Sequence, residues 1–260
     1  MLKLYEYTFE KKGLILESDV GFGEISPLPG FSKETFEEAK WETLQVLKNK
    51  RKPSLPSVIF GFSNVNKPLT PIKVPLCALH KPHSGCKALK LKLGNLSVEN
   101  AIAHVKRYLG KYSLRLDFNQ KWSLSQALEF ASHFEKTDFE YLEEPVKEYK
   151  DLLEFSIKIG FPLALDESKK RVPSVKALVI KPTLWGTIPK TDLPIVLSSS
   201  YESSLGILQI AMLNRSKIPQ GLDTFKTDLL DPPLKIENGY LVWEGSKNPV
   251  DKSKLCPIAL

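Results

Sequence analysis

Apolar segments that each carry a charged residue near one end recur through the middle of this 260-residue chain. The first, residues 88–94, reads A-L-K-L-K-L-G, and its strict alternation is typical of a β-strand with Lys90 and Lys92 on one face. Four later segments repeat the design, and their charged residues are Asp117, Glu143, Asp166 and Lys181. Segments with helical spacing lie between most of them. This strand–helix alternation predicts parallel pairing.

The number of such segments favours a closed sheet. We expect strands at residues 72–79, 88–94, 113–119, 139–145, 162–168, 177–183 and 194–200, and a weak last one at 218–224. Eight strands fit an α/β barrel of the TIM type better than an open sheet. The connections 169–176 and 184–193 are too short for a crossover helix of about ten residues, so some helices are expected to be shortened.

The start of the chain has a different pattern, typical of a small α+β unit. Alternating segments predict two or three antiparallel strands, which lead into the proline-containing loop 27–32. A helix is expected from about residue 32 to residue 49, because its first turns are acidic. The proline-rich stretch 53–72 is expected to be a linker, with a loop at residues 60–62.

This change of pattern sets the expected domain boundaries. Residues 1–72 should form a capping domain and residues 73–224 the barrel. The segment 225–260 should complete the capping domain. Within it, Asn238-Gly239 stands between two short apolar runs and predicts a hairpin that returns to the N-terminal domain.

Composition excludes several classes of protein. Hydrophobic residues make up 42% and charged residues 26% of the chain, which are ordinary globular values. No apolar run approaches the ~20 residues of a membrane helix, and the N-terminus lacks a signal-peptide pattern. The three cysteines form no even framework, so we expect a cytoplasmic protein without a membrane partner. The net charge of +7 is dispersed, which favours an anionic small molecule over nucleic acid.

The charged strand ends predict one site. Barrel active sites lie at the carboxyl ends of the strands, where Asp117, Glu143 and Asp166 would repel one another if left bare. A hard divalent cation resolves this, and all-oxygen ligands favour Mg²⁺ or Mn²⁺ over zinc. Such a cation, holding a substrate carboxylate, stabilises the enediolate that forms when the neighbouring carbon loses a proton. A lysine beside the cation can act as the base.

Seven motifs, in order along the chain, resemble the enolase superfamily, in which a Lys or His base works with Mg²⁺. Within it they are most similar to the o-succinylbenzoate synthase family of menaquinone biosynthesis. The motifs are G-F-G-E-I-S-P-L-P-G-F-S (21–32), K-L-K (90–92), L-R-L-D-F-N-Q-K-W (114–122), L-E-E-P (142–145), L-D-E-S (165–168), V-I-K-P-T (179–183) and S-S-S-Y-E-S-S-L-G (198–206). The resemblance implies a modified (β/α)7β or (β/α)8 barrel with an N-terminal capping domain.

The resemblance also implies a role for each site residue. Asp117, Glu143 and Asp166 would bind Mg²⁺, Lys92 would be the acid/base, and Lys181 would lie on the opposite face of the substrate. Substrate-binding residues would be Lys90, Asn119, Ser198, Ser199 and Ser200. The loops 27–32 and 60–62 would close over the site. The implied reaction is the syn dehydration of 2-succinyl-6-hydroxy-2,4-cyclohexadiene-1-carboxylate to 2-succinylbenzoate, by a lyase that is a monomer or weak homo-oligomer.

Two other functions fit the same residues. An N-succinylamino acid racemase, or a related epimerase, would use Lys92 and Lys181 as two bases. A barrel that binds a carboxylate ligand without turnover would need less of the constellation. The regular run Cys77-x-x-His80-x-x-His83-x-x-Cys86 resembles no zinc module and is expected to be a plain loop.

Overall fold

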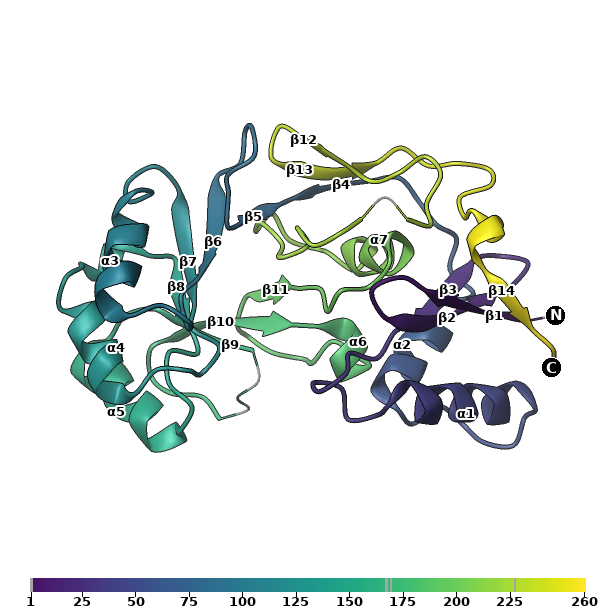
Figure 1. The fold of residues 1–260 in the computed structure, drawn as a ribbon, viewed down its shortest axis with the longest axis horizontal. Coiled ribbons are helices and arrows are strands. Elements are labelled where there is room, and N and C mark those ends of the chain that lie inside the picture. The colour runs from purple at the N-terminus through teal and green to yellow at the C-terminus, as the bar shows by residue number, and fades with distance from the viewer. Residues whose placement is uncertain (1, 167, 169, 227) are drawn as a thin grey trace.

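The computed structural model describes residues 2–166, 168, 170–226 and 228–260. At one end of the molecule lies a four-stranded antiparallel sheet of order β14-β1-β2-β3 (Figure 1). Its strands are β1 (Lys3–Thr8), β2 (Lys12–Glu17), β3 (Phe22–Ile25) and β14 (Cys256–Ile258). The helices α1 (Phe36–Leu47) and α2 (Pro56–Asn64) pack on it around a core that includes Leu14, Ile25 and Val58.

Helix α1 begins at Phe36, later than the start expected at about residue 32. Thr35 is the N-cap: its hydroxyl accepts from the N–H of Glu38 at 3.2 Å, and the Glu38 carboxylate accepts from the N–H of Thr35 at 2.7 Å. This reciprocal pair satisfies two N–H groups that a helix start leaves free.

Helix α2 corrects the interpretation of residues 53–72 as a linker with a loop at residues 60–62. Pro56 opens the helix, a position where its missing N–H costs nothing. Gly61 lies in the helix, and a Cβ there would stand 2.4 Å from the Ile25 side chain. The prolines thus mark a helix start, and the glycine marks close packing against β3.

The middle of the chain forms the expected parallel sheet. Its seven strands are β5 (Cys77–Leu79), β6 (Ala88–Lys92), β7 (Ser113–Asp117), β8 (Tyr141–Glu143), β9 (Leu163–Leu165), β10 (Val175–Ile180) and β11 (Ile195–Leu197), paired in chain order. The expected last strand is reduced to two parallel bridges, Gln220 to Leu76 and Gly221 to Ser198. These bridges join the two edges of the sheet and close the ring.

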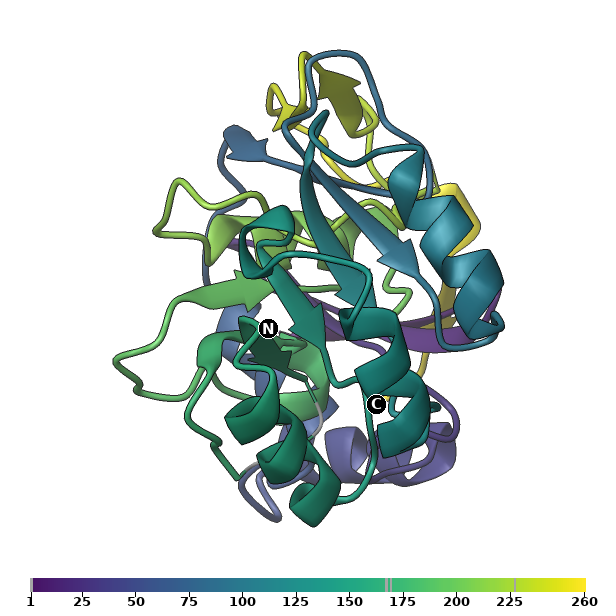
Figure 2. The same cartoon turned by 90° about the vertical axis from the view of Figure 1, so that its left-hand side faces the viewer.

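The crossover helices vary in length, as the short connections predicted. Between strands lie α3 (Val98–Lys106), α4 (Leu124–Ala131), the 3-10 turn η1 (Lys136–Asp138), α5 (Tyr149–Lys158) and the single-turn α6 (Pro182–Trp185), and α7 (Ser204–Met212) follows β11. Among the described residues, no helix joins β9 to β10. Viewed from the barrel end, the teal helices α3, α4 and α5 lie side by side outside the strands (Figure 2).

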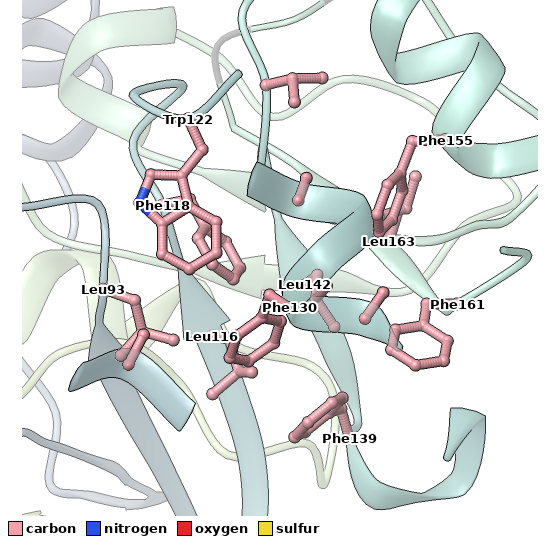
Figure 3. Close-up of a cluster of buried hydrophobic side chains, with 14 of the residues drawn as sticks. Leu93, Leu116, Phe118, Trp122, Phe130, Phe139, Leu142, Phe155, Phe161 and Leu163 are labelled. Atoms are coloured by element: carbon pink, nitrogen blue, oxygen red, sulfur yellow. The ribbon is translucent and has the colours of Figure 1, made fainter. Parts of the chain in front are cut away.

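An aromatic cluster fills the space between these helices and the sheet (Figure 3). Phe118 and Trp122 meet with ring centroids 4.5 Å apart, and both contact Phe130. Because Leu116 and Phe118 point outward into this core, the alternate residues of β7 point into the barrel.

The expected hairpin is confirmed, but the expectation that it returns to the N-terminal domain is wrong, because it joins a separate three-stranded sheet. β12 (Lys235–Glu237) and β13 (Tyr240–Trp243) flank Asn238 and Gly239, which have φ of 50° and 79° as a tight two-residue turn requires. The hairpin pairs with β4 (Ile72–Pro75), so the strand expected at residues 72–79 is divided between two sheets. The strand that returns to the N-terminal sheet is β14, which follows the 3-10 turn η2 (Lys252–Lys254). No helix in the described residues is long and apolar enough to cross a membrane.

Candidate active site

A cavity of about 370 Å³ lies at the carboxyl ends of the barrel strands. Its wall contains every site residue expected from the sequence except Glu143: Lys90, Lys92, Asp117, Asn119, Asp166, Lys181, Ser198, Ser199 and Ser200. Leu28 and Phe31, from the loop 27–32 of the N-terminal domain, also line the cavity. The loop expected at residues 60–62 is part of α2 and does not line the cavity. The size is typical of a small-molecule site.

Strand register brings the charged side chains together. Lys92 pairs with Asp117 across β6 and β7, and Asp117 pairs with Glu143 across β7 and β8. In a parallel sheet, directly paired residues project to the same side, so all three side chains point into the barrel. The intervening leucines of β6 are buried in the outer core. Period-two alternation therefore accounts for this half of the site.

The Lys90 ammonium group joins two of the carboxylates. Its Nζ lies 2.9 Å from Asp117 Oδ2 and 2.8 and 2.7 Å from the two oxygens of Glu143. Burial lowers the pKa of Lys90, but attraction to Glu143 and Asp117 outweighs it and holds that pKa well above its usual value. Burial raises the pKa of Glu143 to about 7; attraction to Lys90 opposes this rise, and the charges of Asp117 and Asp166 add to it.

Lys181 and Asp166 form a second ion pair across the cavity. Burial lowers the pKa of Lys181, and the neighbouring Asp166 carboxylate raises it by more, so the net direction is upward. Lys92 differs from both other lysines, because its side chain is exposed to the cavity. Lys92 is the last residue of β6, and Lys181 follows β10, four strands further round the ring.

The three carboxylates of the site are ligands of the kind that a hard cation prefers. In this structure they are paired with lysine ammonium groups. Asp117, Glu143 and Asp166 supply only oxygen ligands, which Mg²⁺ prefers. Within the described part of the chain, no three His, Cys, Asp or Glu side chains stand close enough together to hold a metal ion. A divalent cation would therefore have to displace the Lys90 and Lys181 ammonium groups from these carboxylates.

The cysteine and histidine run is a loop only from His80 onward, because Cys77 lies in strand β5. Its His83 Nε2 lies 2.7 Å from Asp223 Oδ2, and the same oxygen accepts from the N–H of Leu79 at 2.8 Å. Asp223 also lines the cavity, a position that we did not predict. The signal was present, since Asp223 is a charged residue near the end of the weak strand expected at 218–224.

Two further charged residues support the site from outside the cavity wall. Glu144 Oε1 accepts from the N–H groups of Asp166 at 3.0 Å and Ser168 at 2.6 Å, which fixes the chain on both sides of Glu167. Glu167, for which we expected a supporting hydrogen bond, lies outside the described residues. Arg115 is buried within the ring, where it holds Glu140 and the Pro219 carbonyl.

The comparisons with known proteins cover both halves of the molecule. A protein-family model described as "Enolase C-terminal domain-like" matches residues 78–183, and a second family model, described as "MenC, N-terminal domain", matches residues 5–69. The o-succinylbenzoate synthase of Salmonella paratyphi B is 35% identical, over 78% of this chain and 78% of its own length. The chain belongs to the o-succinylbenzoate synthase family. The Klebsiella pneumoniae member of this family is 34% identical over the same shares of both chains.

Solved structures agree with this assignment at the level of the fold. An o-succinylbenzoate synthase from Thermosynechococcus elongatus BP-1, complexed with Mg in its active site, matches with a TM-score of 0.63 and 24% identity over 86% of this chain and 92% of its own. MenC from Desulfotalea psychrophila LSv54 matches with a TM-score of 0.70 and 15% identity, over 94% and 98%. The expected modified barrel with an N-terminal capping domain is confirmed.

Proposed function

We propose that this chain converts 2-succinyl-6-hydroxy-2,4-cyclohexadiene-1-carboxylate into 2-succinylbenzoate and water, as a lyase of menaquinone biosynthesis. The observation that carries the proposal is the cavity itself. In a member of the o-succinylbenzoate synthase family, it is lined by Lys92 and Lys181 on strands four positions apart. A planar ring bound between these strands would have an amine on each face.

Lys92 is the proposed acid/base. As a neutral amine it takes the proton from the ring carbon that carries the carboxylate, and the C–H electron pair is delocalised onto that carboxylate to give an enediolate. The resulting ammonium group then gives the same proton to the departing hydroxyl, so that the C–O bond breaks and water leaves. One residue serving both steps makes the elimination syn, and formation of the aromatic ring drives it. The exposed position of Lys92 on the cavity wall suits this exchange.

Lys181 is proposed to stabilise the delocalised ring from the other face by cation–π attraction, without a necessary proton transfer. Lys181 pairs with Asp166, and a cation bound by Asp166 would release the Lys181 ammonium group toward the substrate ring. Asn119 and the segment 198–200 line the remaining wall and would contact the substrate through their polar groups. Lys90 would bind the ring carboxylate once released from Asp117 and Glu143.

Asp117, Glu143 and Asp166 are the residues that would hold the divalent cation, for which we propose Mg²⁺, with Mn²⁺ as a substitute. When bound, it supplies positive charge that stabilises the charge developing on the substrate carboxylate. Burial raises the pKa of Glu143 and the charges of Asp117 and Asp166 add to the rise, so a cation at these carboxylates would stabilise the charged form of Glu143.

The deciding experiment follows product formation directly. Purified protein with Mg²⁺ and the cyclohexadiene substrate should produce the aromatic absorbance of 2-succinylbenzoate. EDTA should abolish the reaction, and added Mg²⁺ should restore it. A protein that binds substrate without forming product would indicate a carboxylate-binding barrel and contradict the proposal. Rapid exchange and inversion of an N-succinylamino acid in D₂O, without dehydration, would identify a racemase.

A further inference from the structure

A carboxylate of the N-terminal sheet is buried against the start of α7. Glu24, on β3, is 0% exposed. Its oxygens accept from the N–H of Ser203 at 3.0 Å, from the N–H of Gly206 at 2.8 Å and from the Ser203 hydroxyl. Tyr7 donates to it at 2.7 Å from the same sheet. Burial raises the pKa of Glu24, and the hydrogen bonds from Ser203 and Tyr7 oppose that rise.

Glu24 takes the place of a helix cap. The third N–H of a helix normally donates to the side chain of its own N-cap residue. In α7 the N-cap is Ser203, which makes no such bond because its hydroxyl donates to Glu24. The acceptor for the third N–H, that of Gly206, is therefore Glu24 on β3, which lies 182 residues away in the chain.

The contact is close enough to dictate the residue at position 206. A Cβ added to Gly206 would lie 2.8 Å from Glu24 Cδ and 2.7 Å from Glu202 Cβ. Gln209 adds a second connection, since its side chain accepts from the Glu24 N–H at 3.1 Å and donates to the Phe22 carbonyl at 2.6 Å. Both motifs joined here, residues 21–32 and 198–206, carried the family resemblance, but Glu24 and Ser203 within them had no expected role.

On the barrel side, the contact between Glu24 and the start of α7 lies next to segment 198–200. Glu202, next to Ser203, accepts from the N–H of Ser200 at 2.6 Å and from its hydroxyl at 2.7 Å. The same carboxylate accepts from Thr183, which lies two positions after Lys181. Ser200 and Lys181 both line the cavity.

On the side of the N-terminal domain, Glu24 lies a few residues before loop 27–32. Two residues beyond Glu24, the carbonyl of Ser26 accepts from Lys11 Nζ at 2.9 Å, and the carbonyl of Pro27 accepts from it at 3.3 Å. Leu28 and Phe31, further along the same loop, line the cavity. Glu24 thus connects β3, which continues into loop 27–32, with the start of α7, which follows segment 198–200.

We propose that Glu24 is a positioning residue for the reaction: it docks β3 on α7 and so sets the distance between loop 27–32 and segment 198–200. The inference rests on the proposed function, because both walls are taken to contact the substrate. Neither wall transfers a proton, so a loosened junction should weaken substrate binding more than it slows the chemical step.

The test variant is Glu24→Gln, which keeps the size of the side chain but replaces one acceptor oxygen by an NH₂ group. One donor at the junction then faces another donor. We expect KM to rise about tenfold, the effect of roughly one weakened hydrogen bond, while kcat stays within about threefold of wild type. Hydrogen exchange at the Gly206 amide should also become faster.

Glu42→Gln is the matched control. Glu42 is also 0% exposed and accepts from the N–H groups of Ser54 at 3.2 Å and Leu55 at 2.8 Å, within the N-terminal domain. This variant should lower the melting temperature and leave KM unchanged. An equal rise of KM in both variants, or an unchanged KM in Glu24→Gln, would overturn the proposal.

Ser203→Ala provides a second route if Glu24→Gln folds poorly. It removes one donor to Glu24 and leaves the carboxylate in place, so KM should rise in the same direction but by less. A wild-type KM in this variant also counts against the inference. Wild-type protein in the same assay separates the two proposals: an inactive wild type refutes the proposed function, whereas an active one leaves the positioning role to be judged by the variants.

Discussion

The three lysines of the cavity differ in what holds them. Lys90 and Lys181 form ion pairs with carboxylates, whereas Lys92 is exposed to the cavity. Replacing Lys92 should therefore leave the fold intact and remove only chemistry. We predict that Lys92→Ala loses roughly 10²–10⁴-fold in kcat/KM, the contribution of a general acid–base group, and keeps the wild-type melting temperature. Lys106→Ala, on the outer helix α3, should be fully active; an equally active Lys92→Ala would exclude Lys92 from the mechanism.

Lys90 gives a test of the cation site that does not depend on turnover. Without its ammonium group, Asp117 and Glu143 would be two buried carboxylates with no neighbouring positive charge between them. Breaking a buried ion pair in this way costs about 3–5 kcal/mol. We predict that Lys90→Met lowers the free energy of unfolding by this amount in EDTA, and that Mg²⁺ then stabilises the variant more than the wild type. Calorimetry that gives equal Mg²⁺ effects on both proteins would argue against a cation at these carboxylates.

At this scale the sequence predicted what strand parity controls. Asp117, Glu143 and Lys181 come together because each stands near the end of an alternating strand, and that alternation is visible in one dimension. The Lys90 ion pairs and the role of Glu24 depend on which side chains meet across sheets. No local pattern encodes those distances, so they required the structure.

Among the elements, helix α2 shows how packing changes the effect of a glycine. A glycine inside a helix usually costs about 1 kcal/mol relative to alanine, so alanine should stabilise it. At Gly61, however, a Cβ would stand 2.4 Å from the Ile25 side chain and 3.1 Å from the Glu24 carbonyl. We predict that Gly61→Ala destabilises the protein by about 1–3 kcal/mol in urea unfolding, the usual cost of overpacking. Ser63→Ala, on the same helix, should change stability little; a stabilised Gly61→Ala would show that α2 does not pack tightly on β3.

Helix prediction succeeded where the helical spacing is regular. Segments with helical spacing were expected between the strands, and α3 and α4 lie there; Ser97 and Ser123 cap them, because each serine side chain accepts a helix N–H. Helix α2 was missed because the prolines around it are typical of linkers. The strand expected at 72–79 was divided because its first half pairs with a hairpin from residues 235–243, a long-range choice that local alternation does not specify.

At the scale of the whole molecule, the two ends of the chain meet in one sheet. β14 pairs with β1, and Lys252 donates to Glu17 on β2 at 2.5 Å. Tyr5 donates to the same carboxylate at 2.7 Å. The C-terminal segment thus completes the N-terminal sheet, and the barrel is inserted between two parts of it. We propose on this basis that residues 1–72 and 225–260 act as one capping unit.

The stability of this junction should depend on pH. Burial raises the pKa of Glu17, but hydrogen bonds from Lys252 and Tyr5 lower it by more, so the folded-state pKa lies below the usual value. A lowered folded-state pKa contributes stability that is present above the unfolded pKa of about 4.3 and is lost as pH falls through the folded value. We predict that wild type is more stable than Glu17→Gln at pH 7 and that the difference shrinks below about pH 4. Urea unfolding at both pH values measures this difference in stability.

Glu38 is the control, since the pKa of its exposed carboxyl is lowered by Thr35 within α1 alone. Glu38→Gln should leave the contact between the chain ends intact, so that β14 remains as protected from hydrogen exchange as in wild type. Glu17→Gln should make hydrogen exchange in β14 faster. Equal protection in both variants would show that Glu17 does not hold the chain ends together.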